Sequence, residues 1–120
     1  MKKQRDFIIF LEDMADSVKK IEEYTKGISQ KSFLGKEQII DAVIRRFEII
    51  GEASRHIPAS FKRKYKDVEW KKIAGMRNVL IHEYFGVNKE KLWLTIKEDI
   101  PVLKVKLLEI FEEFKKQKLL

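Results

Sequence analysis

Apolar residues recur at spacings of three and four along most of this sequence, and that period restricts its fold more than any other feature. A period of about 3.6 residues places such residues on one side of an α-helix, whereas a strand needs alternation at every second residue. No segment shows strand alternation, and no internal repeat or low-complexity stretch is present. The sequence therefore predicts an all-α fold, an antiparallel bundle of four to five helices formed by one domain over residues 1–120.

The first half of the chain predicts two long amphipathic helices. One covers residues 4–26 and stops at Gly27, because glycine accepts the backbone conformation that ends a helix. The other begins near Lys36 and ends at residues 56–58, the last of which is a proline. Residues 28–35 lie between them, and their lack of a sustained period predicts a connection.

The second half predicts a short helix and two more long ones. Pro58 can open the short helix, since proline is tolerated in a first turn. Asp67 is the predicted cap of the next helix, which ends at Gly86, and Asn88 is the predicted cap of the longest one. Pro101 falls inside this last pattern and predicts a kink or a break in the preceding turn, because its ring removes a backbone donor.

Charge and composition narrow the classes of function. Lys and Arg total 26 against 19 Asp and Glu, and the net charge of +7 favours an anionic partner, nucleic acid or an acidic protein. A solubilising surface explains the same charge equally well. The absence of cysteine excludes disulfides and thiolate chemistry, and two histidines far apart in sequence argue against a zinc hydrolase. Without a readable signal peptide or a long apolar run, the expected location is the cytoplasm.

Residues 76–84, Met-Arg-Asn-Val-Leu-Ile-His-Glu-Tyr, place polar side chains on a helix that otherwise has the pattern of a core helix. Arg77 and His82 point roughly 140° apart on one helix. Asn78 shares a face with His82, four residues later, and Arg77 shares another face with Tyr84, seven residues later. Polar residues that interrupt a core pattern in this way are candidates for function.

These residue types suit RNA cleavage by transesterification, in which a base removes the proton of the ribose 2′-OH and a cation stabilises the charge on the phosphate. Histidine exchanges protons near neutral pH, so His82 suits the first role, and the planar guanidinium of Arg77 suits the second. Asn78 can hold the imidazole or a phosphate oxygen, and Tyr84 can donate from its hydroxyl. This route needs no metal and no other cofactor. In an arbitrary helix, however, such a histidine more often forms hydrogen bonds inside the bundle.

The order of Arg77, Asn78, His82 and Tyr84 resembles the signature of the HEPN superfamily, in which an Arg, a polar residue and a His line a nuclease site. The Tyr two residues after the His resembles the HepT branch. The resemblance covers most of the chain and includes Arg45, residues 48–53, Trp70, Ile73, Met76, residues 85–87 and Trp93. One departure is Lys36, where the family commonly has Asp after a Phe-Leu pair.

The resemblance implies a homodimer in which two signature helices face each other, so that both copies supply Arg77 and His82 to one composite cleft. It also implies that the chain is the toxin of a type VII toxin–antitoxin pair, whose partner is a minimal nucleotidyltransferase antitoxin. In that family the partner transfers AMP from ATP to the signature tyrosine, so Tyr84 is the expected modification site. A bulky anion there would block and repel an RNA backbone.

A second group of candidate residues is basic and surrounds Phe61, Tyr65 and Trp70, an arrangement that can hold a single strand of RNA by charge and stacking. The basic residues are Lys62, Arg63, Lys64, Lys66, Lys71 and Lys72. Phe61 and Trp70 are better explained as core residues, and solvated lysines explain the charges about equally well.

Two functions remain open from the sequence. One is an RNA endonuclease that uses Arg77 and His82. The other is a HEPN binding module without cleavage activity that recruits nucleotide or substrate to a nucleotidyltransferase partner. The joint presence of the signature residues favours the first, and the signature helix is too apolar for the recognition helix of a DNA-binding regulator. Glu52 is a supporting residue that can orient Arg77 or Arg45 by a charge-assisted pair, or form a structural ion pair that fixes helix packing.

Overall fold

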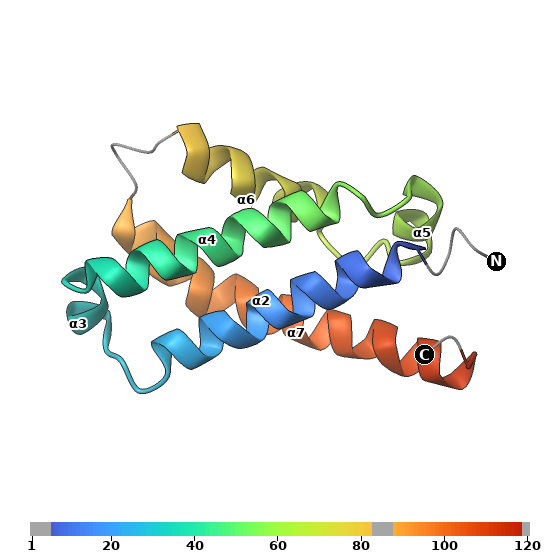
Figure 1. The fold of residues 1–120 in the computed structure, drawn as a ribbon, viewed down its shortest axis with the longest axis horizontal. Helices are drawn as coiled ribbons and strands as arrows, with labels where there is room; N and C mark the ends of the chain where they lie inside the picture. The colour runs from blue at the N-terminus through green and yellow to red at the C-terminus, as the bar shows by residue number, and fades with distance from the viewer. Residues whose placement is uncertain (1–5, 83–87, 119–120) are drawn as a thin grey trace.

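The structure is a computed structural model that describes residues 6–82 and 88–118, and for residues 76 and 78–82 it describes the backbone. The described residues form helices and no strand, which confirms the all-α prediction. The helices are α2 (Ile8–Thr25), α3 (Gln30–Leu34), α4 (Glu37–Ser54), α5 (Ala59–Lys64), α6 (Trp70–His82) and α7 (Lys89–Lys116). Consecutive long helices run in opposite directions (Figure 1), so the bundle is antiparallel as predicted.

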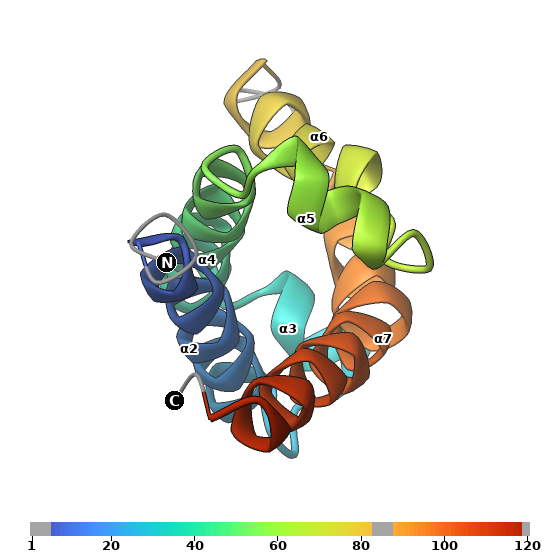
Figure 2. The same cartoon turned by 90° about the vertical axis from the view of Figure 1, so that its right-hand side faces the viewer.

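The four long helices surround a common axis, and the short helices α3 and α5 lie toward opposite ends of the bundle (Figures 1 and 2). Side chains from every long helix fill the space along this axis. The helix α6 contributes the buried Trp70 and Ile73. The largest fully buried side chains of the described residues are Leu11, Met14, Ile21, Phe33, Phe47, Ile50, Ile100 and Ile110. Burial of this apolar surface is the main favourable contribution to folding. No helix in the described ranges is long and apolar enough to cross a membrane.

Helix α3 corrects one sequence prediction, because Gln30–Leu34 form a helix inside the segment expected to be a connection. The hydroxyl of Ser29 caps it by accepting from the amide of Ser32 at 3.2 Å. Phe33 is fully buried, and its ring centroid lies 5.0 Å from that of Trp93 on α7. A helix of five residues is too short to show a period, so its cap and one buried ring determine it.

Of the kink or break expected at Pro101, the break is absent, since α7 continues from Lys89 to Lys116 with the proline inside it. Ile100 and Leu103, beside the proline, are both buried in the core. Their burial offsets the lost backbone hydrogen bond, which costs about 3 kcal/mol in a helix interior. At the start of α7, Asn88 is the predicted cap, and its side chain accepts from the amide of Lys91 at 3.0 Å.

The cap predicted for α6 is also corrected. Asp67 accepts from the ammonium group of Lys106 on α7 at 2.6 Å, and α6 begins later, at Trp70. A second pair joins Lys72 of α6 to Asp99 of α7 at 3.0 Å. The carboxylate that the local pattern assigns to a helix start thus connects the segment before α6 to α7. The predicted end of α6 at Gly86 lies outside the described residues.

Glycine permits the close contact between α4 and α6. A Cβ atom added to Gly51 would lie 2.7 Å from the Cβ of Arg77 and 3.1 Å from its backbone nitrogen. Contacts that short do not occur between real Cβ atoms, so any side chain at this position would push the two helices apart. At Gly75, by contrast, an added Cβ would meet nothing within 4 Å.

We predict that Gly51→Ala lowers the free energy of unfolding by about 1–3 kcal/mol, the usual cost of overpacking a close contact. Gly75→Ala is the matched control, since it adds the same methyl group to α6 in open space and gains up to about 1 kcal/mol of helix propensity. Urea unfolding followed by circular dichroism measures both. Equal stabilities of the two variants would show that the α4–α6 contact tolerates a side chain.

A second prediction concerns the Asp67–Lys106 pair. The hydrogen bond from Lys106 lowers the pKa of the Asp67 carboxyl below its ordinary value of 3.8. A carboxyl with a lowered pKa stabilises the fold above its ordinary pKa, and this contribution disappears as the pH falls through the lowered value. The parent should therefore melt above Asp67→Asn at about pH 6, and the two melting temperatures should converge toward about pH 2.

Thermal melts across this pH range measure the effect. Asp41→Asn is the control, because Asp41 is an exposed carboxylate of α4 for which the described residues show no ion pair. Its melting temperature should follow the parent at every pH. A gap between the parent and Asp67→Asn that stays constant with pH would contradict the proposed linkage.

Candidate functional site

The close contact between α4 and α6 brings the side chain of Arg77 next to Glu52, the residue after Gly51. The Nε of Arg77 lies 2.9 Å from Oε2 of Glu52, with the two side chains 32% and 49% exposed. A bond between a guanidinium and a carboxylate is short and directional, so it fixes the orientation of the arginine. The contact expected between these residues is therefore present, while their part in catalysis stays a prediction.

Glu52 also faces a histidine. Its other carboxylate oxygen, Oε1, lies 3.7 Å from Nε2 of His56, which follows the end of α4, and Arg55 lies 4.0 Å from Oε2. The ring of His56 stacks on Phe10 of α2, with centroids 4.5 Å apart and planes inclined by 13°. Glu52 thus connects an arginine of α6 with an aromatic pair formed by α2 and the end of α4.

These groups line a groove of about 380 Å³ between α2, α4 and α6. The residues that line it are Phe10, Asp13, Arg45, Glu48, Ile49, Glu52, Ala53, His56 and Arg77. The groove carries both signs of charge and has an aromatic side. A hollow of this composition can hold an anion at Arg77 together with a flat ring at His56.

Sequence reasoning did not select His56, Phe10 or Asp13 as site residues. One local signal existed, since Glu52 and His56 are four residues apart and such pairs share a helix face. Nothing in the sequence indicates that Phe10 lies against this face, because the packing of α2 on α4 creates that contact.

The rest of the predicted signature is described only in part. Asn78 and His82 lie on α6 with Arg77, but their side chains are outside the described residues, and so is the whole of Tyr84. Helix geometry sets a rise of about 7.5 Å between Arg77 and His82. The structure therefore brings together Arg77 and Glu52, and it leaves the positions of the other signature side chains open.

The predicted basic residues lie on α5, on the segment after it and in the first turn of α6. Lys62 lies 5.9 Å from the ring centre of Trp70, a cation–π contact. Lys72 is held by Asp99 and Glu69, and the hydrogen bond and charge of Asp99 raise the pKa of its ammonium group. Arg63, Lys64, Lys66 and Lys71 are exposed, which leaves them accessible to an anion.

Phe61 and Trp70, two of the three aromatic residues inside this basic region, belong to the core, as the sequence favoured. Phe61 and Trp70 are buried, and the indole nitrogen of Trp70 donates to the carbonyl oxygen of Tyr65 at 3.0 Å. Burial and the charge of Glu113 raise the pKa of the partly exposed Tyr65. A base cannot stack on the buried rings of Phe61 and Trp70, so the basic side chains around them offer charge without a stacking surface from these two rings.

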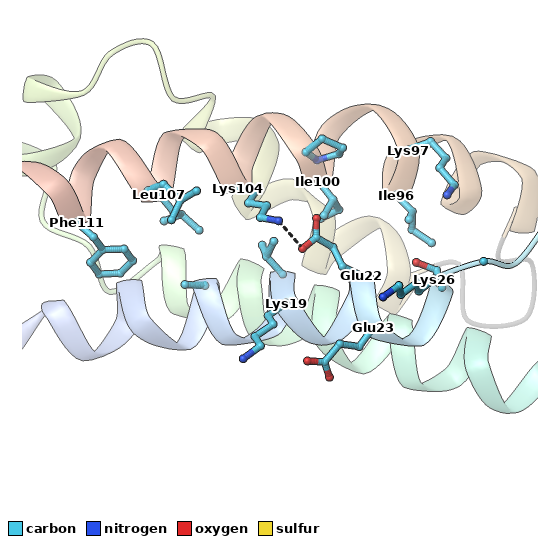
Figure 3. A pocket seen from close by; sticks show the side chains of 16 residues that line it. Lys19, Glu22, Glu23, Lys26, Ile96, Lys97, Ile100, Lys104, Leu107 and Phe111 are labelled. Carbon is cyan, nitrogen blue, oxygen red and sulfur yellow. Dashed lines mark ion pairs between the residues drawn. The ribbon is translucent and has the colours of Figure 1, made fainter.

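A larger hollow, of about 760 Å³, opens between α2 and α7 (Figure 3). Apolar side chains such as Ile96, Ile100 and Leu107 line it, and an ion pair of 3.1 Å between Lys104 and Glu22 joins α7 to α2 there. None of the predicted site residues whose side chains the structure describes lines this hollow. Within the described part of the chain, no group of three or more His, Asp or Glu residues is placed to hold a metal ion.

Comparison with a family model and comparison with individual proteins point to the same family. The family model described as "Ribonuclease HepT-like" matches residues 14–110, which is more than half of the chain. The chain is 49% identical over 107 residues to "Probable ribonuclease HepT" of Thermococcus cleftensis, a match that covers 89% of this chain and 94% of that protein. It is 42% identical over 106 residues to a "Putative RNase" of Caldanaerobacter subterraneus, covering 88% of this chain and 95% of that protein.

Another relative is longer. "Gamma-glutamylcyclotransferase and putative RNase" of Methanocaldococcus jannaschii is 44% identical over 115 residues, which covers 96% of this chain and 52% of that protein. The chain thus spans about half the length of this relative. No solved structure matches the chain significantly.

Proposed function

This chain belongs to the HepT-like ribonuclease family, and we propose that it is an RNA endonuclease that cleaves by transesterification without a metal ion. The observation that carries the proposal is the bond between Arg77 and Glu52 beside a groove of mixed charge. It holds a permanent cation in a fixed orientation at the surface, where a phosphate can reach it.

The chemistry needs one base and one cation. His82 removes the proton of the ribose 2′-OH, the 2′ oxygen attacks phosphorus, and the bond from phosphorus to the 5′ oxygen breaks. The products are a 2′,3′-cyclic phosphate and a 5′-hydroxyl, to which a proton returns. Because the pair with Glu52 uses Nε, the two terminal nitrogens of Arg77 can donate to the phosphate oxygens as charge develops. Asn78 supports this arrangement by hydrogen bonding to the imidazole or the phosphate.

The proposed active form is a homodimer. Arg77 and His82 point roughly 140° apart on one helix, so a single α6 does not direct both at one phosphate. Two copies of α6 that face each other across a composite cleft would supply the arginine of one and the histidine of the other. The exposed basic residues Arg63, Lys64, Lys66 and Lys71 would add charge for the RNA backbone, and Lys62 and Lys72 would contribute less because each already has a partner.

We predict that the unmodified chain cleaves total RNA in EDTA and leaves matched DNA intact, because DNA lacks the attacking hydroxyl. His82→Ala and Arg77→Ala should each reduce the rate by about a hundredfold or more. Arg46→Ala is the matched control, since Arg46 lies on α4 but does not line the groove, and its rate should equal the parent rate. Gel electrophoresis of time points measures the rates.

Intact RNA with every protein, from a preparation with unmodified Tyr84, would favour the alternative of a HEPN binding module without cleavage activity. Cleavage that survives both active-site variants would show that other residues carry the chemistry.

We also propose that the chain is the toxin of a type VII toxin–antitoxin pair, neutralised when a minimal nucleotidyltransferase transfers AMP from ATP to Tyr84. The phenolic oxygen attacks the α-phosphorus of ATP, pyrophosphate leaves, and the product carries a bulky anion two residues after His82. This anion would occupy the cleft and repel the phosphate backbone of RNA.

The prediction is that incubation with such a nucleotidyltransferase and ATP adds the mass of AMP to the chain and abolishes RNA cleavage. Tyr84→Phe should gain no mass and should escape neutralisation, while the control Tyr24→Phe should behave as the parent. Intact-protein and peptide mass spectrometry locate the group. AMP on Tyr84→Phe, or cleavage that persists after full modification, would refute this mode of control.

A further inference from the structure

The stacked pair of Phe10 and His56 differs from the other aromatic contacts of the described residues. Its planes are inclined by 13°, whereas those contacts have inclinations of 38° or more. The other pairs belong to the core or its edge, where rings meet at the tilted angles that aromatic packing prefers. A near-parallel pair on the side of a groove presents a flat surface instead.

His56 is held from two sides and remains accessible. One face of the imidazole lies on Phe10, and its Nε2 edge is directed toward Glu52 at 3.7 Å. The side chain is nevertheless 51% exposed, and because Phe10 covers one face of the ring, a second ring could stack only on the opposite face. Core packing does not require a ring in this position, since Ile57, the next residue, is the one buried.

The charged side chains in the groove favour a phosphate at one place and an uncharged ring at another. Arg77 and Arg45 line the groove and attract phosphate, while Asp13 and Glu48 line the same groove and repel it. Glu52 is engaged by Arg77 and faces His56. A phosphate is therefore favoured at the arginines, and an uncharged ring is favoured at His56, beside the carboxylate of Glu52.

We propose that His56, supported by Phe10, is the stacking surface for one nucleobase of single-stranded RNA whose adjacent phosphate binds Arg77. This inference rests on the proposed function, and it specifies that the RNA substrate is single-stranded where it contacts His56. Every nucleobase has an aromatic face, and proteins that bind single strands use exposed aromatic rings in this manner. A base inside a duplex is already stacked on both sides and cannot use the surface.

A competing role for His56 is proton transfer. Two substitutions of His56 distinguish proton transfer from base stacking. Phenylalanine keeps a flat ring that can stack but cannot carry a proton. Glutamine keeps a polar group of similar reach but has no aromatic face. The stacking role therefore predicts that His56→Phe binds RNA well and His56→Gln binds it poorly, whereas proton transfer predicts no difference in binding between them.

The experiment measures binding of a fluorescein-labelled adenosine dodecamer by fluorescence anisotropy, with all proteins carrying His82→Ala so that the RNA stays intact. His56→Ala and His56→Gln should weaken binding about tenfold. The affinity of His56→Phe should stay within about twofold of that of the His82→Ala protein that keeps His56. Phe10→Leu, which removes the support, should also weaken binding. Lys115→Ala, at an exposed position of α7, is the control and should have no effect.

A duplex of the same length supplies the second comparison, because the His56 variants should bind it as the parent does. Equal affinity of His56→Ala and the parent for the single strand, or equal losses in His56→Phe and His56→Gln, would overturn the stacking role, as would a failure of the parent to bind the single strand. Circular dichroism verifies that each variant is folded. The cleavage assay with intact His82 is separate, so a protein that binds in this pattern without cleaving would retain the stacking site and lose the nuclease proposal.

Discussion

The close contact of α4 and α6 at Gly51 is the constraint on which the candidate site depends. With no side chain at Gly51, the backbone of Arg77 approaches α4 so closely that an added Cβ would lie 2.7 Å from the arginine Cβ. This approach determines where the guanidinium emerges and lets Nε reach the neighbouring Glu52 at 2.9 Å. A larger residue would move α6 outward and lengthen that bond, so helix packing sets the geometry of the charged group.

The exposure of the Arg77–Glu52 pair indicates what the pair contributes. Ion pairs between solvent-exposed groups typically add less than about 1 kcal/mol to stability, because water screens the charges and two side chains lose freedom. With Arg77 32% exposed and Glu52 49% exposed, the pair belongs mainly to this class. The Arg77–Glu52 pair therefore contributes little to stability. It can still hold the arginine in one orientation beside the groove, because this needs only the contact and not burial.

The sequence predicted the elements whose signals are local and missed those that depend on distant residues. Periodicity located the four long helices, and Asn88 was recognised as a cap because its hydrogen bond is made three residues away. Asp67 has the same local pattern, but Lys106 binds its carboxylate across 39 positions of sequence. Pro101 likewise breaks an isolated helix, yet it is tolerated in α7 because Ile100 and Leu103 anchor the helix on both sides.

The same distinction applies to the site. Residue chemistry and the family resemblance placed Arg77 and Glu52 among the candidates, but the ring of His56 stacks on Phe10, a residue of another helix. Glu52 contacts both Arg77 and His56, so a change at Glu52 would disturb the proposed phosphate and base positions together. A change at Phe10 would release only the ring. The two proposed positions are thus coupled through one carboxylate, and α2 supports one of them through Phe10 although it carries no residue of the signature.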